Sequence, residues 1–337
     1  MSDVQCIHSL FLCDSPKNVD LVFGNGRRQQ VQTLTNCYHE IVIPAEFNSH
    51  ASKLSETEVI FSTWDIPQRD VRVFDHLPNL KALFYAAGSV QSFAPVLLDR
   101  GIAVCSAADA NAIPVAEFTT AQILLANKGY FHNVRDYRES MNEHSAFCGP
   151  GNFGETVALL GAGKIGRKVI ELLRSYNLRI IVYDPYLPEH VAKELGVKKV
   201  SLEEAFREGF IISNHLANLP STKKMIKGSH FRSMRPNAVF INTGRGATIA
   251  QEEMVIVLKE RPDSFALLDV IGEDPIDKES CEVLFSLPNV QLSGHIAGSK
   301  NDELVRMADY MIEEFKRWSK GEELRFAVTK KMLETMA

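Results

Sequence analysis

The chain has 337 residues, of which 45% are hydrophobic and 23% charged, so its length predicts about two domains of ordinary globular composition. A formal net charge of −5 and the lack of a dense Lys/Arg stripe argue against a nucleic-acid partner. No apolar run approaches the roughly 18 residues that a membrane span needs, so we expect no membrane partner.

The first apolar stretch, residues 6–13, has no basic region ahead of it, which favours a strand over a signal peptide. The six cysteines form no CxxC pair and have no zinc spacing, so we interpret them as reduced thiols of a cytoplasmic protein. The ten histidines are scattered without an HExxH or HxH cluster. We therefore predict no metal site.

Short β-rich runs alternate with helical patterns along most of the chain. The predicted strands of a first series are residues 6–13, 58–64, 80–87 and 102–108. Those of a second series are residues 156–163, 179–185, 209–216, 238–244, 264–270 and 290–294. The alternation predicts an α/β architecture with parallel sheets. A helix after Ser201 carries Glu204 three residues on, the signature of a capping box.

Two long helical patterns flank the second series of strands. One covers residues 114–140, with Pro114 in its first turn, and the other covers residues 301–323 and ends at Gly321. Both are interpreted as connectors that carry the chain into and out of the second domain.

The first domain is then discontinuous. We expect a substrate domain of residues 1–112 plus 309–337 and a nucleotide-binding domain of residues 113–308.

A glycine array lies between the first strand and the first helix of the second series. Gly161, Gly163 and Gly166 form GxGxxG, and Lys164 and Ile165 open the amphipathic helix. Because this context is the one that a dinucleotide fingerprint requires, the backbone N–H groups at the helix start are expected to hold a pyrophosphate.

The next strand of the series ends at Asp184, where a carboxylate can accept hydrogen bonds from the adenosine ribose. No Arg or Lys follows closely to receive a 2′-phosphate. The sequence therefore favours NAD over NADP.

Three further polar sites each follow a predicted strand of the nucleotide-binding domain. Arg245 follows residues 238–244, the acidic pair Glu273 and Asp274 follows residues 264–270, and His295 follows residues 290–294. Taken singly, an interdomain ion pair, a solvated turn and a core histidine would explain them. Taken together, a guanidinium for a carboxylate, an imidazole for a proton and a carboxylate to orient the imidazole favour redox chemistry on a hydroxy acid.

These motifs resemble those of the D-isomer-specific 2-hydroxyacid dehydrogenase family, whose members include D-lactate, D-glycerate, hydroxypyruvate and phosphoglycerate dehydrogenases. The matching segments are GETVALLGAGKIGRKV, NTGRGATI, LLDVIGEDP and PNVQLSGHIAGS, with PVAEFTTAQILL upstream. The resemblance is strong from about residue 101 to 320. It implies two Rossmann/flavodoxin-like parallel-sheet domains with the active site in the interdomain cleft.

The resemblance also implies roles for individual residues. Arg245 takes the family's substrate-binding role and His295 its acid/base role, oriented by Asp274 or, one residue earlier, by Glu273. The remaining residues with implied roles are Ala87 and Gly88 for the substrate carboxylate, and Thr243, Gly244, Asp269 and Gly298 for the cofactor.

The expected activity is NAD-dependent interconversion of a 2-hydroxy acid, the D-isomer by resemblance, with its 2-oxo acid. The alternative is an NAD(H)-sensing binding protein or corepressor on the same fold. The resemblance further implies a homodimer formed around the helix that begins near Pro114.

Overall fold

The computed structural model describes residues 7–66, 71–272 and 278–335. The chain divides into two compact units, one formed by Met1–Asn111 with Ser299–Ala337 and the other by Ala112–Gly298. The chain returns to the first unit at Ser299, whereas the sequence placed the return at residue 309, inside a helix that packs on the first sheet. Among the described residues no helix is long and apolar enough to cross a membrane.

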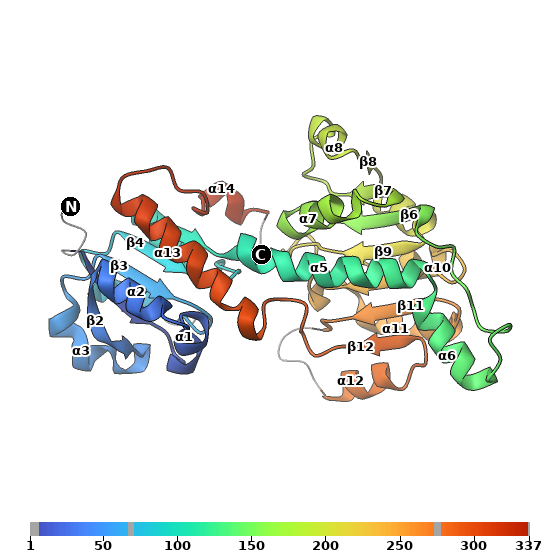
Figure 1. Cartoon of the computed structure of the whole chain (residues 1–337), viewed down its shortest axis with the longest axis horizontal. Coiled ribbons are helices and arrows are strands. Elements are labelled where there is room, and N and C mark those ends of the chain that lie inside the picture. The colour runs from blue at the N-terminus through green and yellow to red at the C-terminus, as the bar shows by residue number, and fades with distance from the viewer. Residues whose placement is uncertain (1–6, 67–70, 273–277, 336–337) are drawn as a thin grey trace. The chain divides into compact units, whose positions relative to one another are not determined.

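The first unit contains a parallel sheet in the order β2-β1-β3-β4-β5, the flavodoxin-like arrangement (Figure 1). Its strands are β1 His8–Leu12, β2 Asn36–Val42, β3 Val59–Ser62, β4 Ala82–Tyr85 and β5 Ala103–Ser106. Its helices are α1 Pro16–Val22, α2 Arg27–Leu34, α3 Phe47–Leu54, α4 Ala94–Asp99, α13 Val305–Ser319 and α14 Lys330–Leu333, with 3-10 turns η2 Pro44–Glu46, η3 Val71–His76 and η5 Asn301–Glu303.

Alternate residues of these strands supply a core on each face of the sheet. Leu10, Ile60 and Leu83 belong to one core, and their neighbours Phe11 and Phe61 belong to the other. The second core also holds the apolar face of α13, which the C-terminal part of the chain contributes. Both ends of the chain thus contribute residues to the first unit.

The second unit contains a parallel sheet in the order β12-β11-β10-β9-β6-β7-β8 (Figure 1). Its strands are β6 Phe153–Leu160, β7 Asn177–Tyr183, β8 Lys198–Lys199, β9 Ile211–Asn214, β10 Val239–Asn242, β11 Phe265–Leu268 and β12 Val290–Leu292. Its helices are α6 Tyr130–Ser140, α7 Lys164–Leu173, α8 Glu189–Leu195, α9 Leu202–Glu208, α10 Gly228–Ser233, α11 Gln251–Glu260 and α12 Lys278–Phe285, with the 3-10 turn η4 Gly246–Thr248. Helix α5, Ala108–Asn127, contains the boundary between the units.

The second sheet has the strand order of a Rossmann domain with one additional strand. The chain runs outward from β6 to β7 and β8, then crosses back to β9 on the other side of β6 and continues to β12. The order of the strands therefore reverses between β6 and β9, and ligands of such sheets bind at the carboxyl ends of the strands at this point.

Local signals in the sequence hold at several positions. The predicted strands of both series are present, and Ser201 and Glu204 form the expected capping box at the start of α9. The five described cysteines are free thiols.

The prediction of one long helix over residues 114–140 is wrong. The structure has two helices there, α5 and α6, separated at Gly129. Helix α5 begins at Ala108, so Pro114 lies inside it rather than in its first turn. Gly129 has a φ of 78°, and a side chain there would collide with the backbone of Gly149. A distant loop thus ends the helix.

Candidate active site

The glycine array forms the turn between β6 and α7, and its three glycines serve different purposes. Gly161 has a φ of +100°, and a Cβ at this residue would lie 2.9 Å from the backbone oxygen of His215. A Cβ at Gly166 would collide with the carbonyl oxygen of Gly161. A Cβ at Gly163 would meet no protein atom within 4 Å. The first and third glycines are therefore required by the fold, whereas the second leaves open space in front of the helix.

The N-terminus of α7 faces that open space. Gly163 is its N-cap, no side chain caps it, and Lys164 and Ile165 form its first turn. An uncapped helix N-terminus with room beside it can hold a phosphate group. These residues fit the pyrophosphate of a dinucleotide.

Asp184 lies just after β7, beside the glycine loop. Its Oδ2 accepts a hydrogen bond of 2.8 Å from the backbone N–H of Ala162, and its Oδ1 accepts one of 2.8 Å from the N–H of Tyr186. Each carboxylate oxygen has more than one lone pair, so both keep the capacity to accept hydroxyl groups. The two backbone N–H groups therefore orient this carboxylate and leave it able to accept further hydrogen bonds.

Arg245 follows β10 and precedes the turn η4. It is half-buried, and the partial loss of water around the guanidinium lowers its pKa. The Nη1 group donates to the carbonyl oxygen of Gly244 at 2.9 Å. Within residues 7–66, 71–272 and 278–335 no carboxylate forms an ion pair with it. Because a guanidinium stays charged, this position favours an anion.

His295 lies in the loop after β12, and the buried carboxylate of Asp269 organises that loop. Asp269 Oδ1 accepts from Ser293 Oγ at 2.7 Å and from the N–H of Ile296 at 2.8 Å, and Oδ2 accepts from the N–H of Ala297 at 2.9 Å. The N–H of His295 donates to the backbone oxygen of Asp269 at 3.1 Å. His295 is exposed and has a φ of 55°, a conformation that few side chains adopt without such support.

Two of the other expected cofactor residues lie at the same edge of the second sheet. Thr243 is buried and its hydroxyl bonds to that of Thr119 at 2.9 Å. A Cβ at Gly244 would approach the backbone oxygen of Asn214 to 3.0 Å. Gly298 is the last residue of the second unit. The carboxylates expected to orient the histidine, Glu273 and Asp274, lie outside the described residues.

In the first unit, Ala87 and Gly88 follow β4 at the carboxyl end of that sheet. The hydroxyl of Ser106, at the end of β5, donates to the carbonyl oxygens of Ala87 at 3.0 Å and Gly88 at 2.7 Å. The neighbouring strand thus fixes the backbone of the expected substrate loop.

Two residues at the end of β9 contact the loops that carry the predicted site residues, and the sequence analysis did not name them. Asn214 is fully buried and bonds to residues of the β10 loop, as described below. His215 packs its backbone against the glycine loop, and burial lowers the pKa of its imidazole to about 4. A signal was available, because both are polar residues at the carboxyl end of an otherwise apolar predicted strand, residues 209–216.

A doubly wound parallel sheet with this glycine loop at its switch point defines the second unit as a dinucleotide-binding domain. The model of the D-isomer specific 2-hydroxyacid dehydrogenase NAD binding domain matches residues 120–297, more than half of the chain. The protein belongs to that family.

Two relatives illustrate the similarity. A D-3-phosphoglycerate dehydrogenase of Methanocaldococcus jannaschii is 29% identical over 225 residues, which are 66% of this chain and 42% of that protein. A glyoxylate reductase of Korarchaeum cryptofilum is 30% identical over 258 residues, which are 75% of this chain and 77% of that protein. The match thus spans less than two thirds of the first relative.

Among solved structures, the holo form of D-mandelate dehydrogenase from Rhodotorula graminis superposes with a TM-score of 0.77 at 19% identity, covering 96% of this chain and 98% of that one. D-2-hydroxyisocaproate dehydrogenase superposes with a TM-score of 0.73, also at 19% identity, covering 96% and 100% of the two chains. At this level of identity the likeness concerns the fold.

Proposed function

We propose that this protein is an NAD-dependent 2-hydroxyacid dehydrogenase that interconverts a 2-hydroxy acid of D configuration and its 2-oxo acid. The observation that carries the proposal is Arg245, a half-buried guanidinium at the ligand-binding edge of the second sheet without a carboxylate partner among the described residues. A planar guanidinium can hold a substrate carboxylate by two hydrogen bonds and polarise the adjacent carbonyl group.

The second unit offers a place for each part of the cofactor. Gly163 and the first turn of α7 would hold the pyrophosphate, and Asp184 would accept the ribose hydroxyls. Since a 2′-phosphate would be repelled by this carboxylate, NAD is favoured over NADP. Thr243, Gly244 and Gly298 are proposed to line the nicotinamide end. When bound, the nicotinamide supplies the hydride for reduction of the 2-oxo acid or accepts it from the hydroxy acid.

Arg245 and the backbone of Ala87 and Gly88 are proposed to bind the substrate carboxylate. The contribution of the first unit stays a prediction. It is supported by the two hydrogen bonds from the Ser106 hydroxyl that hold the carbonyl groups of Ala87 and Gly88. A carboxylate held at one end presents its neighbouring carbonyl carbon in a fixed orientation, which is the positional contribution to catalysis.

His295 is proposed to move the proton. In the reduction direction it donates a proton to the carbonyl oxygen, and in oxidation it removes the hydroxyl proton. Asp274, or Glu273 beside it, is proposed to orient the imidazole. Asp269, expected from the resemblance to contact the nicotinamide, has both carboxylate oxygens bonded to the histidine loop, which supports an additional role in holding His295 in place.

The test is NADH oxidation with a panel of 2-oxo acids in the parent protein and in two variants. Arg245→Lys keeps the charge but loses the planar fork, so KM for the 2-oxo acid should rise while the affinity for NADH stays close to that of the parent. Arg232→Lys is the matched control, since Arg232 pairs with Glu260 on the surface of the second unit. Equal KM values in the parent and Arg245→Lys would contradict the proposal.

A second arm separates the enzyme from the alternative of an NAD(H)-sensing protein. His295→Ala should lower reduction about 10²- to 10⁴-fold while NADH still binds. Tight NADH binding by the parent without turnover of any 2-oxo acid would favour the sensing protein instead.

We also propose that the protein forms a homodimer through α6. Tyr130, Val134, Tyr137 and Met141 follow one another at helical spacing, and their exposed fractions are 49%, 45%, 50% and 81%. Such an apolar stripe favours contact with a partner surface. Light scattering should detect a dimer that Tyr137→Glu dissociates and that Leu21→Glu, an equally exposed site on α1, leaves intact. A parent monomer would refute this assembly.

A further inference from the structure

A chain of buried amide groups joins the carboxyl ends of β9, β10 and β11. Asn214 and Asn242 are 0% exposed. Asn214 Nδ2 donates to Asn242 Oδ1 at 2.9 Å, and Asn242 Nδ2 donates to the backbone oxygen of Val270 at 3.2 Å. Three adjacent strands of the second sheet are thereby linked where their loops begin.

The same amide chain reaches the backbone on both sides of Arg245. Asn214 Nδ2 donates a second hydrogen bond, at 2.9 Å, to the hydroxyl of Thr248, which in turn donates to the carbonyl oxygen of Arg245 at 2.8 Å. On the other side, the N–H of Gly244 donates to Asn242 Oδ1 at 3.2 Å. Both Nδ2 hydrogens of Asn214 are thereby used, and its Oδ1 accepts a hydrogen bond from the N–H of Leu216 at 3.2 Å.

We infer that Asn214 is a positioning residue for Arg245. Its amide fixes the two groups, Asn242 and Thr248, that hold the backbone immediately before and after the arginine. A buried network in which every amide hydrogen of Asn214 is bonded holds its members in one arrangement, because a shift would leave a buried donor without a partner. The inference rests on the proposed role of Arg245 in binding the substrate carboxylate.

The substitution Asn214→Asp tests this inference, because it keeps the shape of the side chain and removes its Nδ2 donor. In Asn214→Asp an oxygen replaces the Nδ2 donor and faces Asn242 Oδ1, an acceptor. The Thr248 hydroxyl can then bond to this new oxygen only by releasing the carbonyl of Arg245. KM for the 2-oxo acid should therefore rise about 5- to 30-fold, the factor expected for one or two lost buried hydrogen bonds, with the NADH affinity within about twofold of the parent.

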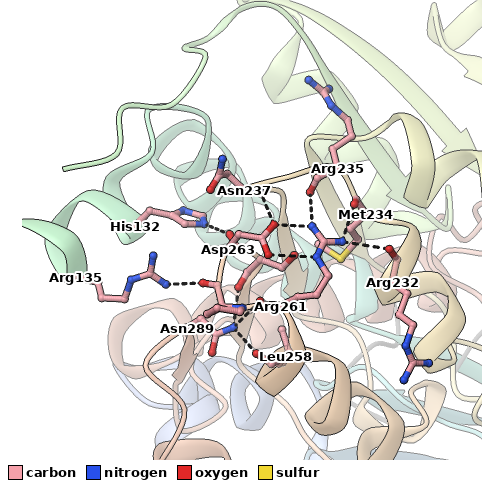
Figure 2. Close-up of polar contacts among 12 residues, drawn as sticks. His132, Arg135, Arg232, Met234, Arg235, Asn237, Leu258, Arg261, Asp263 and Asn289 are labelled. Carbon is pink, nitrogen blue, oxygen red and sulfur yellow. Dashed lines mark hydrogen bonds and ion pairs between the residues drawn. The ribbon is translucent and has the colours of Figure 1, made fainter. Parts of the chain in front are cut away.

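Asn289 provides a matched control in the same unit. It is 1% exposed, and Figure 2 shows its amide donating to the backbone around Arg261. Its Nδ2 also bonds to the carbonyl oxygens of Leu258 and Ser264 at 2.9 Å each. Because Asn289 precedes β12, this network lies at the amino ends of the strands, opposite to Arg245. Asn289→Asp should therefore lower stability without raising KM.

Hydrogen exchange tests the positioning independently of turnover. Exchange of the N–H groups in residues 243–249 should accelerate at least tenfold in Asn214→Asp and remain at the parent rate in Asn289→Asp. If the aspartate variants fail to fold, Asn214→Ala and Asn289→Ala give the same comparison. Thr248→Val should reproduce the raised KM, and its effect should not add to that of Asn214→Asp, because both break one connection.

The outcomes separate this inference from the proposed function. A parent protein that reduces no 2-oxo acid refutes the proposed function, and the exchange experiment then still reports whether Asn214 orders the loop. Parent-like exchange of residues 243–249 in Asn214→Asp overturns the inference, as does faster exchange with an unchanged KM in an active enzyme. A raised KM and faster exchange in Asn214→Asp but not in Asn289→Asp support it.

Discussion

The glycine loop offers a test in which two substitutions with the same chemistry should fail in different ways. Gly163→Ala and Gly166→Ala each add one methyl group, three residues apart. The methyl group at residue 163 enters space that no protein atom occupies within 4 Å, whereas the one at residue 166 meets the backbone of Gly161. We expect the first change to affect NADH binding and the second to affect folding.

The size of each effect follows from these surroundings. The Cβ at Gly166 would lie closer to the Gly161 oxygen than the 3.0 Å that real Cβ atoms keep, and 3.1 Å from its carbonyl carbon. The turn must shift by about 1 Å, and overpacking of this kind costs about 1–3 kcal/mol. In a unit of this size that lowers Tm by roughly 2–12 °C. Gly163→Ala changes only a helix N-cap, which costs a few tenths to about 1 kcal/mol.

The assay is a thermal melt and an NADH titration, followed by fluorescence, for the parent and both variants. Gly163→Ala should keep a Tm within about 3 °C of the parent and weaken NADH binding tenfold or more, which is about 1.4 kcal/mol. For Gly166→Ala we expect a lowered Tm as the main effect. Parent-like NADH affinity in Gly163→Ala would refute the placement of the pyrophosphate at α7, and an unchanged Tm in Gly166→Ala would refute the steric argument.

Three further predictions concern charged groups. Asp184→Ser should weaken NAD binding by about 1.5–3 kcal/mol and raise the relative affinity for NADP, as measured by titration with both cofactors; an unchanged preference would place the ribose elsewhere. A carboxylate beside an imidazole favours its charged form, so Asp274→Asn should move the pH profile of reduction to lower pH, whereas Glu273→Gln should do so only if Glu273 is the partner of His295; two parent-like profiles would refute the pairing. Burial lowers the pKa of His215 to about 4, below its value in the unfolded chain. The free energy of unfolding should therefore fall as pH drops from about 6.5 towards 4, at up to about 1.4 kcal/mol per pH unit. Urea unfolding of His215→Gln should show a flatter pH dependence, and equal slopes in parent and variant would contradict the burial argument.

The sequence by itself determined the features that depend on near neighbours in the chain. The predicted strands are present because each is a short apolar run whose alternate residues can cover both faces of a sheet. The capping box at Ser201 needs only Glu204, three residues away. GxGxxG between a strand and a helix predicted a tight turn with open space before the helix, and the structure has two glycines that the fold requires and a third with no protein atom within 4 Å of its Cβ position.

Strand β2 was not recognised from the sequence. Its residues, Asn36–Val42, are mostly half-buried or exposed, since it lies at the edge of the first sheet and lacks a continuous apolar pattern. The break at Gly129 depends on the backbone of Gly149, twenty residues later. The sequence around residue 129 does not reveal that a segment twenty residues away packs against it.

The candidate site also combines features that the sequence predicts with features that depend on the tertiary structure. Placement after apolar strands marked Arg245 and His295 as candidates, because parallel strands bring their carboxyl ends to one edge. That Asn214 bonds to the loop around Arg245, and Asp269 to the loop around His295, depends on strand order. A buried amide or carboxylate finds its partners across neighbouring strands, so only the tertiary structure decided which polar groups hold the catalytic candidates in place.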